Sequence, residues 1–256
     1  MPASPAQLEV RGIGKLFGGL SALEEVSFTA PAGRLLGLIG PNGAGKSTLF
    51  NIIAGAFRPS RGAVLLDGRD VTPLGSAGRA RMGIGRTFQL ATLFHELSAM
   101  QNVLQAVLCR APRRTLAGLL QSEAYRREQQ ACEARARQVL ETLDIDAYWN
   151  QRAGGLPLGV RKLLTVAVAL ATEPRLLLLD EPAAGLSEEE GRRLMARIDA
   201  TLRGRCTVIV VEHHLKLIQR FCEQVIVLEF GRVIYDGPPA GLKGNTRVVD
   251  AYLGHD

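Results

Sequence analysis

The most constraining feature of this chain is a glycine-rich segment that joins an apolar run to an amphipathic stretch. Leu35–Ile39 form the apolar run, which predicts a buried strand, and residues 49–53 carry apolar side chains at helical spacing before Gly55. The segment between them fits the pattern G-x-x-x-x-G-K-[ST]. Its residues are Gly40, Pro41, Asn42, Gly43, Ala44, Gly45, Lys46 and Ser47. A strand, a loop and a helix in this order predict an α/β fold with the loop at the carboxyl end of a strand.

This glycine-rich loop has the chemistry of a phosphate-binding site. Backbone N–H groups of such a loop, and of the helix N-terminus that follows, face phosphate oxygens. We expect Lys46 to neutralise the β and γ oxygens, Ser47 to ligate Mg²⁺, and Thr48 to lie near the α-phosphate. The pattern is expected by chance only about 0.005 times in a chain of this composition, so an ordinary glycine turn is a poor explanation.

A second expected buried strand, residues 176–179, is followed directly by Asp180 and Glu181. Ligands bind at the carboxyl ends of the strands in open α/β sheets, so both carboxylates are expected beside the phosphate loop. We expect Asp180 to hold Mg²⁺ through water and Glu181 to polarise the water that attacks the γ-phosphate. The alternative is a solvated Asp-Glu pair where a strand meets a loop.

The surrounding pattern predicts how these motifs are organised. Short strand-like runs at 8–13, 23–29 and 63–66 predict a local β-structure around the loop. From residue 176 the pattern alternates between apolar strands and helices, which is typical of a buried, mainly parallel sheet. The expected elements are a helix at 188–202 and strands at 207–211 and 225–228.

Between about residues 90 and 165 the pattern becomes helical. Its apolar positions at helical spacing are Tyr125, Cys132, Ala136, Val139, Leu140 and Leu143. The fold class expected is therefore α/β, with a P-loop NTPase core, an N-terminal antiparallel β part and an inserted α-helical subdomain. We expect residues 1–256 to form one ATPase domain, with a core of 1–89 and 166–256 and a helical subdomain of 90–165.

Composition excludes several other classes of protein. Hydrophobic residues make up 46% and charged residues 22%, which is typical of a globular chain. No apolar run approaches the ~20 residues that span a bilayer, and no secretory signal pattern is present, so a cytoplasmic protein is expected. The net charge is +6, but the basic stretches are short and the last of them is interleaved with glutamates. This pattern favours a solvated helix face over a nucleic-acid partner. The cysteines lack metal-site spacing and are expected to be reduced, small core residues; they are Cys109, Cys132, Cys206 and Cys222.

Over nearly its whole length the chain resembles the ATP-binding subunits of ABC transporters, which implies ATP and Mg²⁺ as ligands. Residues 86–89 resemble the Q-loop, and the resemblance implies that Gln89 senses Mg²⁺ and the attacking water. His213 resembles the switch histidine that senses the γ-phosphate, although a lone loop histidine is often structural. Residues 183–187 resemble the D-loop, with Ser187 where an acid or Asn is usual. Phe17 matches the aromatic residue that stacks on adenine, or it is a core residue.

Within this family the chain is most similar to subunits of importers for polar amino acids of the branched-chain type. Residues 15–20, 39–49, 85–94, 180–186 and 251–254 carry this resemblance. It implies a second ATPase subunit, commonly a paralogue, together with membrane permease subunits and, indirectly, a solute-binding protein. The expected location is then peripheral, on the cytoplasmic face of the inner membrane. The alternatives are a lipopolysaccharide-export-type ATPase and a nucleotide-binding regulatory subunit with little turnover.

The family's signature, Leu-Ser-Gly-Gly-Gln, is degenerate in this chain. The corresponding residues are Leu156, Pro157, Leu158, Gly159 and Val160. In the family this loop caps the ATP held by the other subunit. Proline lacks both a hydroxyl and an N–H, valine cannot replace the glutamine amide, and leucine adds bulk where glycine allows close approach. We therefore expect a heterodimer in which one ATP site is competent and the other mainly holds ATP, unless the helix dipole alone suffices or the copy is weakly active.

Overall fold

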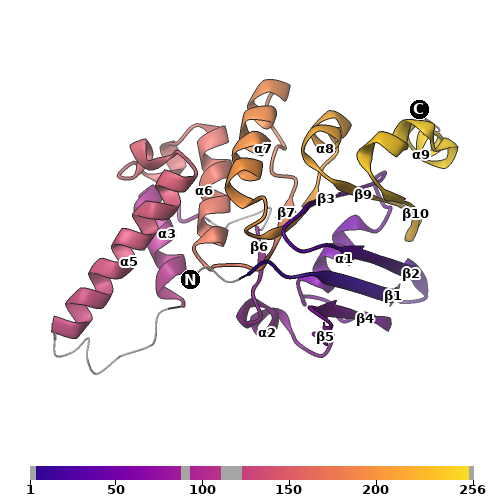
Figure 1. The fold of residues 1–256 in the computed structure, drawn as a ribbon, viewed down its shortest axis with the longest axis horizontal. Helices are drawn as coiled ribbons and strands as arrows, with labels where there is room; N and C mark the ends of the chain where they lie inside the picture. Colours follow the sequence, from indigo (N-terminus) through magenta and orange to yellow (C-terminus); the bar gives the residue numbers. More distant parts are fainter. Residues whose placement is uncertain (1–3, 88–92, 111–122, 254–256) are drawn as a thin grey trace. The chain divides into compact units, whose positions relative to one another are not determined.

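The structure is a computed structural model that describes residues 4–87, 93–110 and 123–253 (Figure 1). Its contacts divide the chain into two compact units. The first unit combines Met1–Arg86 with Pro174–Asp256, and the second is Thr87–Glu173. The sequence placed these boundaries near residues 90 and 165, and residue 165 lies inside a helix of the second unit, Leu158–Leu170.

The first unit contains a six-stranded sheet within the described residues. Its strands run in the order β10 (Arg232–Gly237), β9 (Gln224–Glu229), β3 (Leu35–Ile39), β8 (Thr207–Val211), β7 (Leu176–Asp180) and β6 (Ile84–Arg86). All neighbouring strands are parallel except β10 and β9, which form a hairpin. β3 and β8 are buried along their whole length, which explains why their sequences are apolar except for Thr207 at the start of β8. The mainly parallel sheet is as predicted.

A four-stranded antiparallel sheet supplies the rest of the β-structure described in this unit. Its order is β2 (Leu20–Ala30), β1 (Leu8–Phe17), β4 (Arg61–Leu66) and β5 (Arg69–Asp70). This sheet confirms the N-terminal antiparallel part. The strands β1 and β2 are longer than the sequence predicted, because glycine and polar residues near their ends obscured the alternating pattern.

The helices of the first unit are α1 (Lys46–Ile53), α2 (Ser76–Arg81), α7 (Glu188–Leu202), α8 (Leu215–Phe221) and α9 (Thr246–Leu253), with a 3-10 helix at Pro239–Gly244. The bounds of α7 are those predicted from the sequence. Its start is fixed by a capping box, in which the Ser187 side chain accepts from the N–H of Glu190 and the Glu190 carboxylate accepts from the N–H of Ser187.

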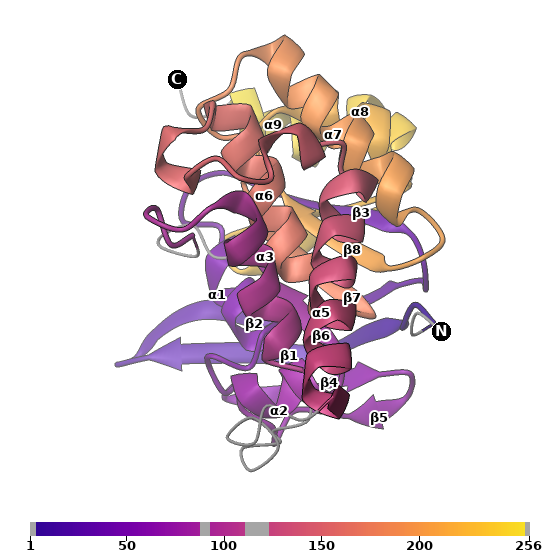
Figure 2. The same cartoon turned by 90° about the vertical axis from the view of Figure 1, so that its left-hand side faces the viewer.

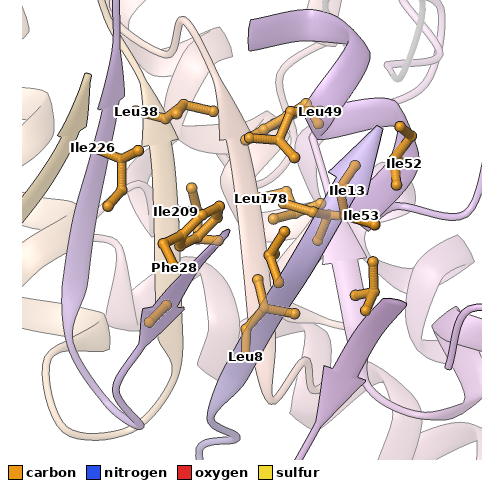
Figure 3. Close-up of a cluster of buried hydrophobic side chains, with 14 of the residues drawn as sticks. Leu8, Ile13, Phe28, Leu38, Leu49, Ile52, Ile53, Leu178, Ile209 and Ile226 are labelled. Atoms are coloured by element: carbon orange, nitrogen blue, oxygen red, sulfur yellow. The ribbon is translucent and has the colours of Figure 1, made fainter. Parts of the chain in front are cut away.

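One hydrophobic cluster ties the two sheets to α1 (Figure 3). Leu8 and Phe28 come from the antiparallel sheet, Leu178 and Ile209 from the mainly parallel sheet, and Leu49 from α1. All five side chains are at most 5% exposed. Burial of this shared core fixes where α1 begins, and therefore where the glycine-rich loop lies in relation to the strand ends.

The far end of α1 is held by a buried arginine. Arg79 on α2 is 1% exposed and its guanidinium donates to the carbonyl oxygens of Ile52 and Ile53, the last residues of α1. It also donates to the carbonyl oxygens of Val71 and Leu74. Burial lowers the pKa of Arg79 from its usual value. The guanidinium thus adds donors to carbonyls in the last turn of α1, where a helix has few donors of its own.

The second unit is a helical subdomain, as predicted. Its longer helices are α3 (Ala99–Leu108), α5 (Glu123–Thr142) and α6 (Leu158–Leu170), with 3-10 helices at Asp146–Tyr148 and Ala153–Gly155. Figure 2 shows α3 and α5 side by side, and α6 contacts both. Of the positions expected on the apolar face of α5, Cys132, Ala136 and Leu140 are buried. Tyr125 is exposed instead, because it lies in the first turn of α5, before the buried part of the helix.

The cysteine prediction was wrong at one position. All four cysteines are free, as expected, and three are buried, but Cys109 is exposed at the C-terminal end of α3. Cys109 is exposed because it lies at the C-cap of α3, where the apolar face of the helix no longer packs against the core.

No helix among the described residues has the length and apolar character needed to cross a membrane.

Candidate functional site

The glycine-rich loop follows β3 directly and leads into α1 at Lys46. Two of its glycines are required by close contacts. Gly40 has φ +147°, and a Cβ there would lie 2.1 Å from the carbonyl oxygen of Leu228. Gly45 has φ +101°, and a Cβ there would lie 2.7 Å from the side chain of Leu23. The loop can therefore follow this path only with glycine at both positions.

A cavity of about 430 Å³ opens over this loop, entirely within the first unit. Its lining residues are Leu20, Ser21, Ala22, Asn42, Gly43, Ala44, Gly45, Lys46, Ser47, Thr48, Glu181, His213, Phe230 and Gly231. The cavity therefore brings most of the predicted phosphate loop together with two of the predicted catalytic side chains.

Lys46 supplies positive charge to this cavity. It is 7% exposed, and its ammonium donates to the carbonyl oxygens of Gly40 (2.6 Å) and Pro41 (2.9 Å). Burial lowers the pKa of Lys46, and the nearby carboxylate of Glu181 opposes that shift. A partly desolvated ammonium gains free energy when an anion approaches, which suits a phosphate.

The strand order explains why the predicted catalytic residues meet. β8 lies between β3 and β7, so the three strand ends carry the glycine-rich loop, His213 and the pair Asp180 and Glu181 along one edge of the sheet. The His213 Nε2 and Glu181 Oε1 atoms are 2.9 Å apart. Glu181 adopts the left-handed conformation, φ +47°, and its N–H donates to the carbonyl of Val211 at 2.9 Å. Such strain in a non-glycine residue is typical of functional positions.

Asp180 is held by an arginine to which the sequence analysis gave no role. The Arg86 guanidinium at the end of β6 donates to Asp180 Oδ2 at 3.1 Å and to Asn51 Oδ1 at 2.5 Å. It also lies 5.5 Å from the centre of the Phe50 ring. The Asp180 side chain is 6% exposed, so this ion pair is largely removed from water. The sequence carried no signal for this ion pair, because β6 has only three residues and was not predicted as a strand.

Glu212 is a second residue without a predicted role. It is 2% exposed, and its Oε1 accepts from the N–H of Ala183 at 2.7 Å. Its other oxygen lies 3.5 Å from Nδ1 of His214. Glu212 thus connects the segment that carries His213 to the start of the segment 183–187. At the end of that segment, Ser187 is occupied in capping α7.

The oxygen-bearing side chains predicted to bind Mg²⁺ have chemistry that suits this ion. This ion prefers hydroxyl, carboxylate, phosphate and water oxygens, and it is usually held by one or two carboxylates rather than by an all-protein cage. Ser47 and Asp180 are donors of this kind, although a role for them in metal binding stays a prediction. The third predicted ligand, Gln89, lies outside the described residues.

Phe17 is not among the residues that line the cavity, although its strand partner Leu20 is. Its ring packs edge-on against Phe57 with centroids 5.7 Å apart, and the Lys15 ammonium is 4.9 Å from its centre. The ring is 43% exposed, so it is not a core residue. Adenine stacking on Phe17 stays a prediction.

The degenerate signature lies in the second unit, at the start of α6. Leu156 is 4% exposed, while Leu158 is 38% exposed and begins the helix. Pro157 occupies the N-cap position with φ −53° and ψ 148°, and no side-chain hydrogen bond caps the helix there. The placement at the start of an apolar helix is as predicted, and a serine at this position would supply the missing cap.

Comparison with known families shows to which family the chain belongs. The ABC transporter family model matches residues 23–184, which include the glycine-rich loop, the signature position and both strand-end carboxylates. The chain belongs to the ABC transporter family. It is an ABC ATPase, which confirms the family and the enzyme class expected from the sequence.

Several relatives align with this ABC ATPase over nearly its full length. The high-affinity branched-chain amino acid transport ATP-binding protein BraF of Pseudomonas aeruginosa is 38% identical, covering 96% of this chain and 97% of the relative. LivG of Escherichia coli, described in the same terms, is 36% identical with the same coverage. A probable LivG of Archaeoglobus fulgidus is 31% identical.

Solved structures confirm the α/β fold. An ATP-binding cassette of an ABC transporter in its ADP conformation matches with a TM-score of 0.85 and 29% identity, covering 98% of this chain and 99% of that one. A nucleotide-free ATP-binding cassette matches with a TM-score of 0.84 and 28% identity, covering 98% and 100%.

Proposed function

We propose that this ABC ATPase powers an importer for amino acids of the branched-chain type, or for a related small polar solute. The observation that carries the proposal is the 36–38% identity, over 96% of the chain, to subunits named for branched-chain amino acid transport. Its partners are then membrane permease subunits and, indirectly, a solute-binding protein. The chain works at the cytoplasmic face of the membrane, bound to the permease.

The residues that line the cavity support the following roles in ATP hydrolysis. Lys46 and the loop N–H groups hold the β- and γ-phosphates, and Glu181 accepts the proton of the attacking water. His213, within hydrogen-bond distance of Glu181, orients that carboxylate and reports the γ-phosphate. Ser47 and, through water, Asp180 would hold Mg²⁺, which would supply positive charge to balance the charge that develops on the phosphates. Closure of two such subunits around ATP transmits work to the permease, and hydrolysis reopens them.

The second ATPase subunit is proposed to be a paralogue with an intact signature. In that heterodimer the ATP held by Lys46, Glu181 and His213 is covered by the partner's signature loop, and that site turns over. The partner's own ATP faces Pro157 and Val160, which offer neither hydroxyl nor amide. That second site mainly holds its nucleotide.

Reconstitution tests the transport role. The chain is purified with the permease subunits and the second ATPase encoded beside it, placed in liposomes, and given ATP and a panel of radiolabelled solutes with the matching binding protein. We expect uptake of a branched-chain or polar amino acid, and no uptake when this chain carries Glu181→Gln. Outward movement of a lipid instead, or ATP binding with no solute movement, would contradict an importer and favour the export or regulatory alternative.

A further inference from the structure

The backbone of Glu181 adopts a conformation that its sequence disfavours. Its φ of +47° lies in the left-handed region, which residues with a Cβ rarely adopt. The next residue is Pro182, and a proline favours an extended conformation for the residue before it. The position of the predicted base therefore depends on contacts that hold this segment in place.

The end of the neighbouring strand, β8, supplies two of these contacts. The N–H of Glu181 donates to the carbonyl of Val211 at 2.9 Å. Pro182 has no N–H, so the first donor after it belongs to Ala183. That N–H donates to Oε1 of Glu212 at 2.7 Å. One hydrogen bond thus fixes the chain at Glu181, and the other fixes it two residues later.

Burial makes the contact with Glu212 effective. Glu212 is 2% exposed and Ala183 is 1% exposed, so water does not compete for their hydrogen bond. A carboxylate that accepts from an N–H also makes a stronger bond than a neutral acceptor does. A further bond, from the N–H of Ala184 to the carbonyl of Glu181 at 3.1 Å, is local to the turn and does not tie it to β8.

Glu212 is also joined directly to the histidine that meets the predicted base. His213 follows Glu212 in the chain, and its Nε2 lies 2.9 Å from Oε1 of Glu181. The other oxygen of Glu212 lies 3.5 Å from Nδ1 of His214. One buried side chain thus fixes the segment of Glu181 against the segment of His213. This matters because a displacement of about 1 Å in a reacting group can slow a reaction about 10²-fold.

We propose that Glu212 is a positioning residue for ATP hydrolysis, which holds the backbone of Glu181 so that its carboxylate meets His213 at the phosphate cavity. The inference rests on the role of base that is proposed above for Glu181. Glu212 is not among the residues that line the cavity, so it acts through Glu181 and leaves the contacts of the phosphate loop intact. Its loss is therefore expected to slow hydrolysis without weakening ATP binding.

Steady-state ATP hydrolysis by the transporter, reconstituted as above, tests this role. Glu212→Met removes the acceptor with little change in size, and we expect kcat to fall about 10²-fold while KM for ATP changes less than about twofold. Glu212→Gln keeps an oxygen that accepts from the N–H of Ala183, so it is expected to recover most of the rate. In a chain that already carries Glu181→Gln, Glu212→Met is expected to cost less than about threefold more, because both changes act on the same base.

A matched control separates positioning from stability. Thr207 begins the same strand and is 0% exposed; its Oγ1 donates to the carbonyl of Ala6 at 2.6 Å and accepts from the N–H of Gly33 at 2.9 Å. Thr207→Val is expected to lower the melting temperature and to leave kcat unchanged. The Kd for ATP of each Glu212 variant shows whether its cavity is intact, and Glu212→Ala takes the place of Glu212→Met if the latter does not fold.

Three results would overturn the role of Glu212. They are normal turnover in Glu212→Met, a rate in Glu212→Gln as low as that in Glu212→Met, and losses that multiply when Glu212→Met and Glu181→Gln are combined. Normal turnover in Glu181→Gln alone is a different result. It would refute the proposed base, and the role of Glu212 would fall with it.

Discussion

Lys46 and Glu181 lie in one cavity, and we propose different roles for them. Lys46 is proposed to hold negative charge in place, whereas Glu181, within hydrogen-bond distance of His213, is proposed to take a proton. We expect Lys46→Ala to abolish productive ATP binding. Glu181→Gln is expected to keep ATP binding and to lower hydrolysis by about 10²-fold or more, because the amide cannot act as a base. Nucleotide-binding and phosphate-release assays separate these defects, and normal turnover in Glu181→Gln would remove Glu181 from the catalytic role.

The pair of Arg86 with Asp180 makes a prediction about stability. Removing one partner from a buried ion pair leaves a charge without that compensation, so Arg86→Met is expected to lower the free energy of unfolding by about 3 kcal/mol. Urea denaturation measures the change. The control is Arg152→Met, which breaks the exposed pair with Glu96 and is expected to cost less than about 1 kcal/mol. Equal effects of the two substitutions would show that burial of the Asp180 pair is unimportant.

At the scale of single residues, the site residues that could be predicted from the sequence are those that belong to a recognisable motif. The loop 40–47 and the carboxylates Asp180 and Glu181 follow apolar strands, so their location at a sheet edge was predictable. Arg86 and Glu212 were given no role, because their partners are set by the register of strands far apart in sequence.

Among the elements, α7 offers a direct test of helix capping. Ser187→Ala removes the cap and is expected to lower stability by about 1 kcal/mol, while Ser187→Thr largely keeps it. Hydrogen bonds from Ser187 lower the pKa of Glu190 below its ordinary value of 4.5. The capping box therefore stabilises the fold fully above that pH and loses this contribution as the pH falls through the lowered pKa.

Thermal melts of both Ser187 variants across pH 3 to 7 check this prediction. The gap between the unmodified chain and Ser187→Ala is expected to shrink in acid. A gap that grows in acid would contradict the assigned charge state of Glu190.

Element prediction succeeded where pattern and caps agree. The helix at 188–202 and the strands Leu35–Ile39 and Thr207–Val211 have clear periodicity and clear ends, and the structure has the same bounds. The elements β6 and α2 were not predicted, since three and six residues are too few to show a period. Their packing against longer neighbours, rather than local preference, specifies them.

For the whole molecule, the reactivity of the cysteine thiols measures whether the core of each unit is closed to solvent. Burial raises the pKa of Cys206 and of Cys222 to about 12, and Cys132 is also buried, whereas Cys109 is exposed. We expect maleimide at neutral pH to label one thiol per native chain, at Cys109, and all four after denaturation. Mass spectrometry of the labelled peptides checks this. Rapid native labelling of Cys206 would contradict the buried core.

At the scale of the whole molecule, we propose that this ABC ATPase needs a second, different ATPase subunit for fast turnover. If each signature hydrogen bond to a charged phosphate is worth ~1.5–3 kcal/mol, the loss of two slows or weakens the affected site by roughly 10²–10⁴-fold. A homodimer would cover both ATP sites with the loop around Pro157, whereas a heterodimer would impair only one. Restoring the signature by Pro157→Ser, Leu158→Gly and Val160→Gln is expected to raise the rate of the chain alone, and the first and last of these also create a capping box on α6.

The most direct test is steady-state ATP hydrolysis by the purified chain, alone and mixed with a paralogue that carries an intact signature. We predict slow hydrolysis alone, strong stimulation by the paralogue, and loss of that stimulation when this chain carries Glu181→Gln. Brisk, cooperative hydrolysis by the unmodified chain alone would contradict the account.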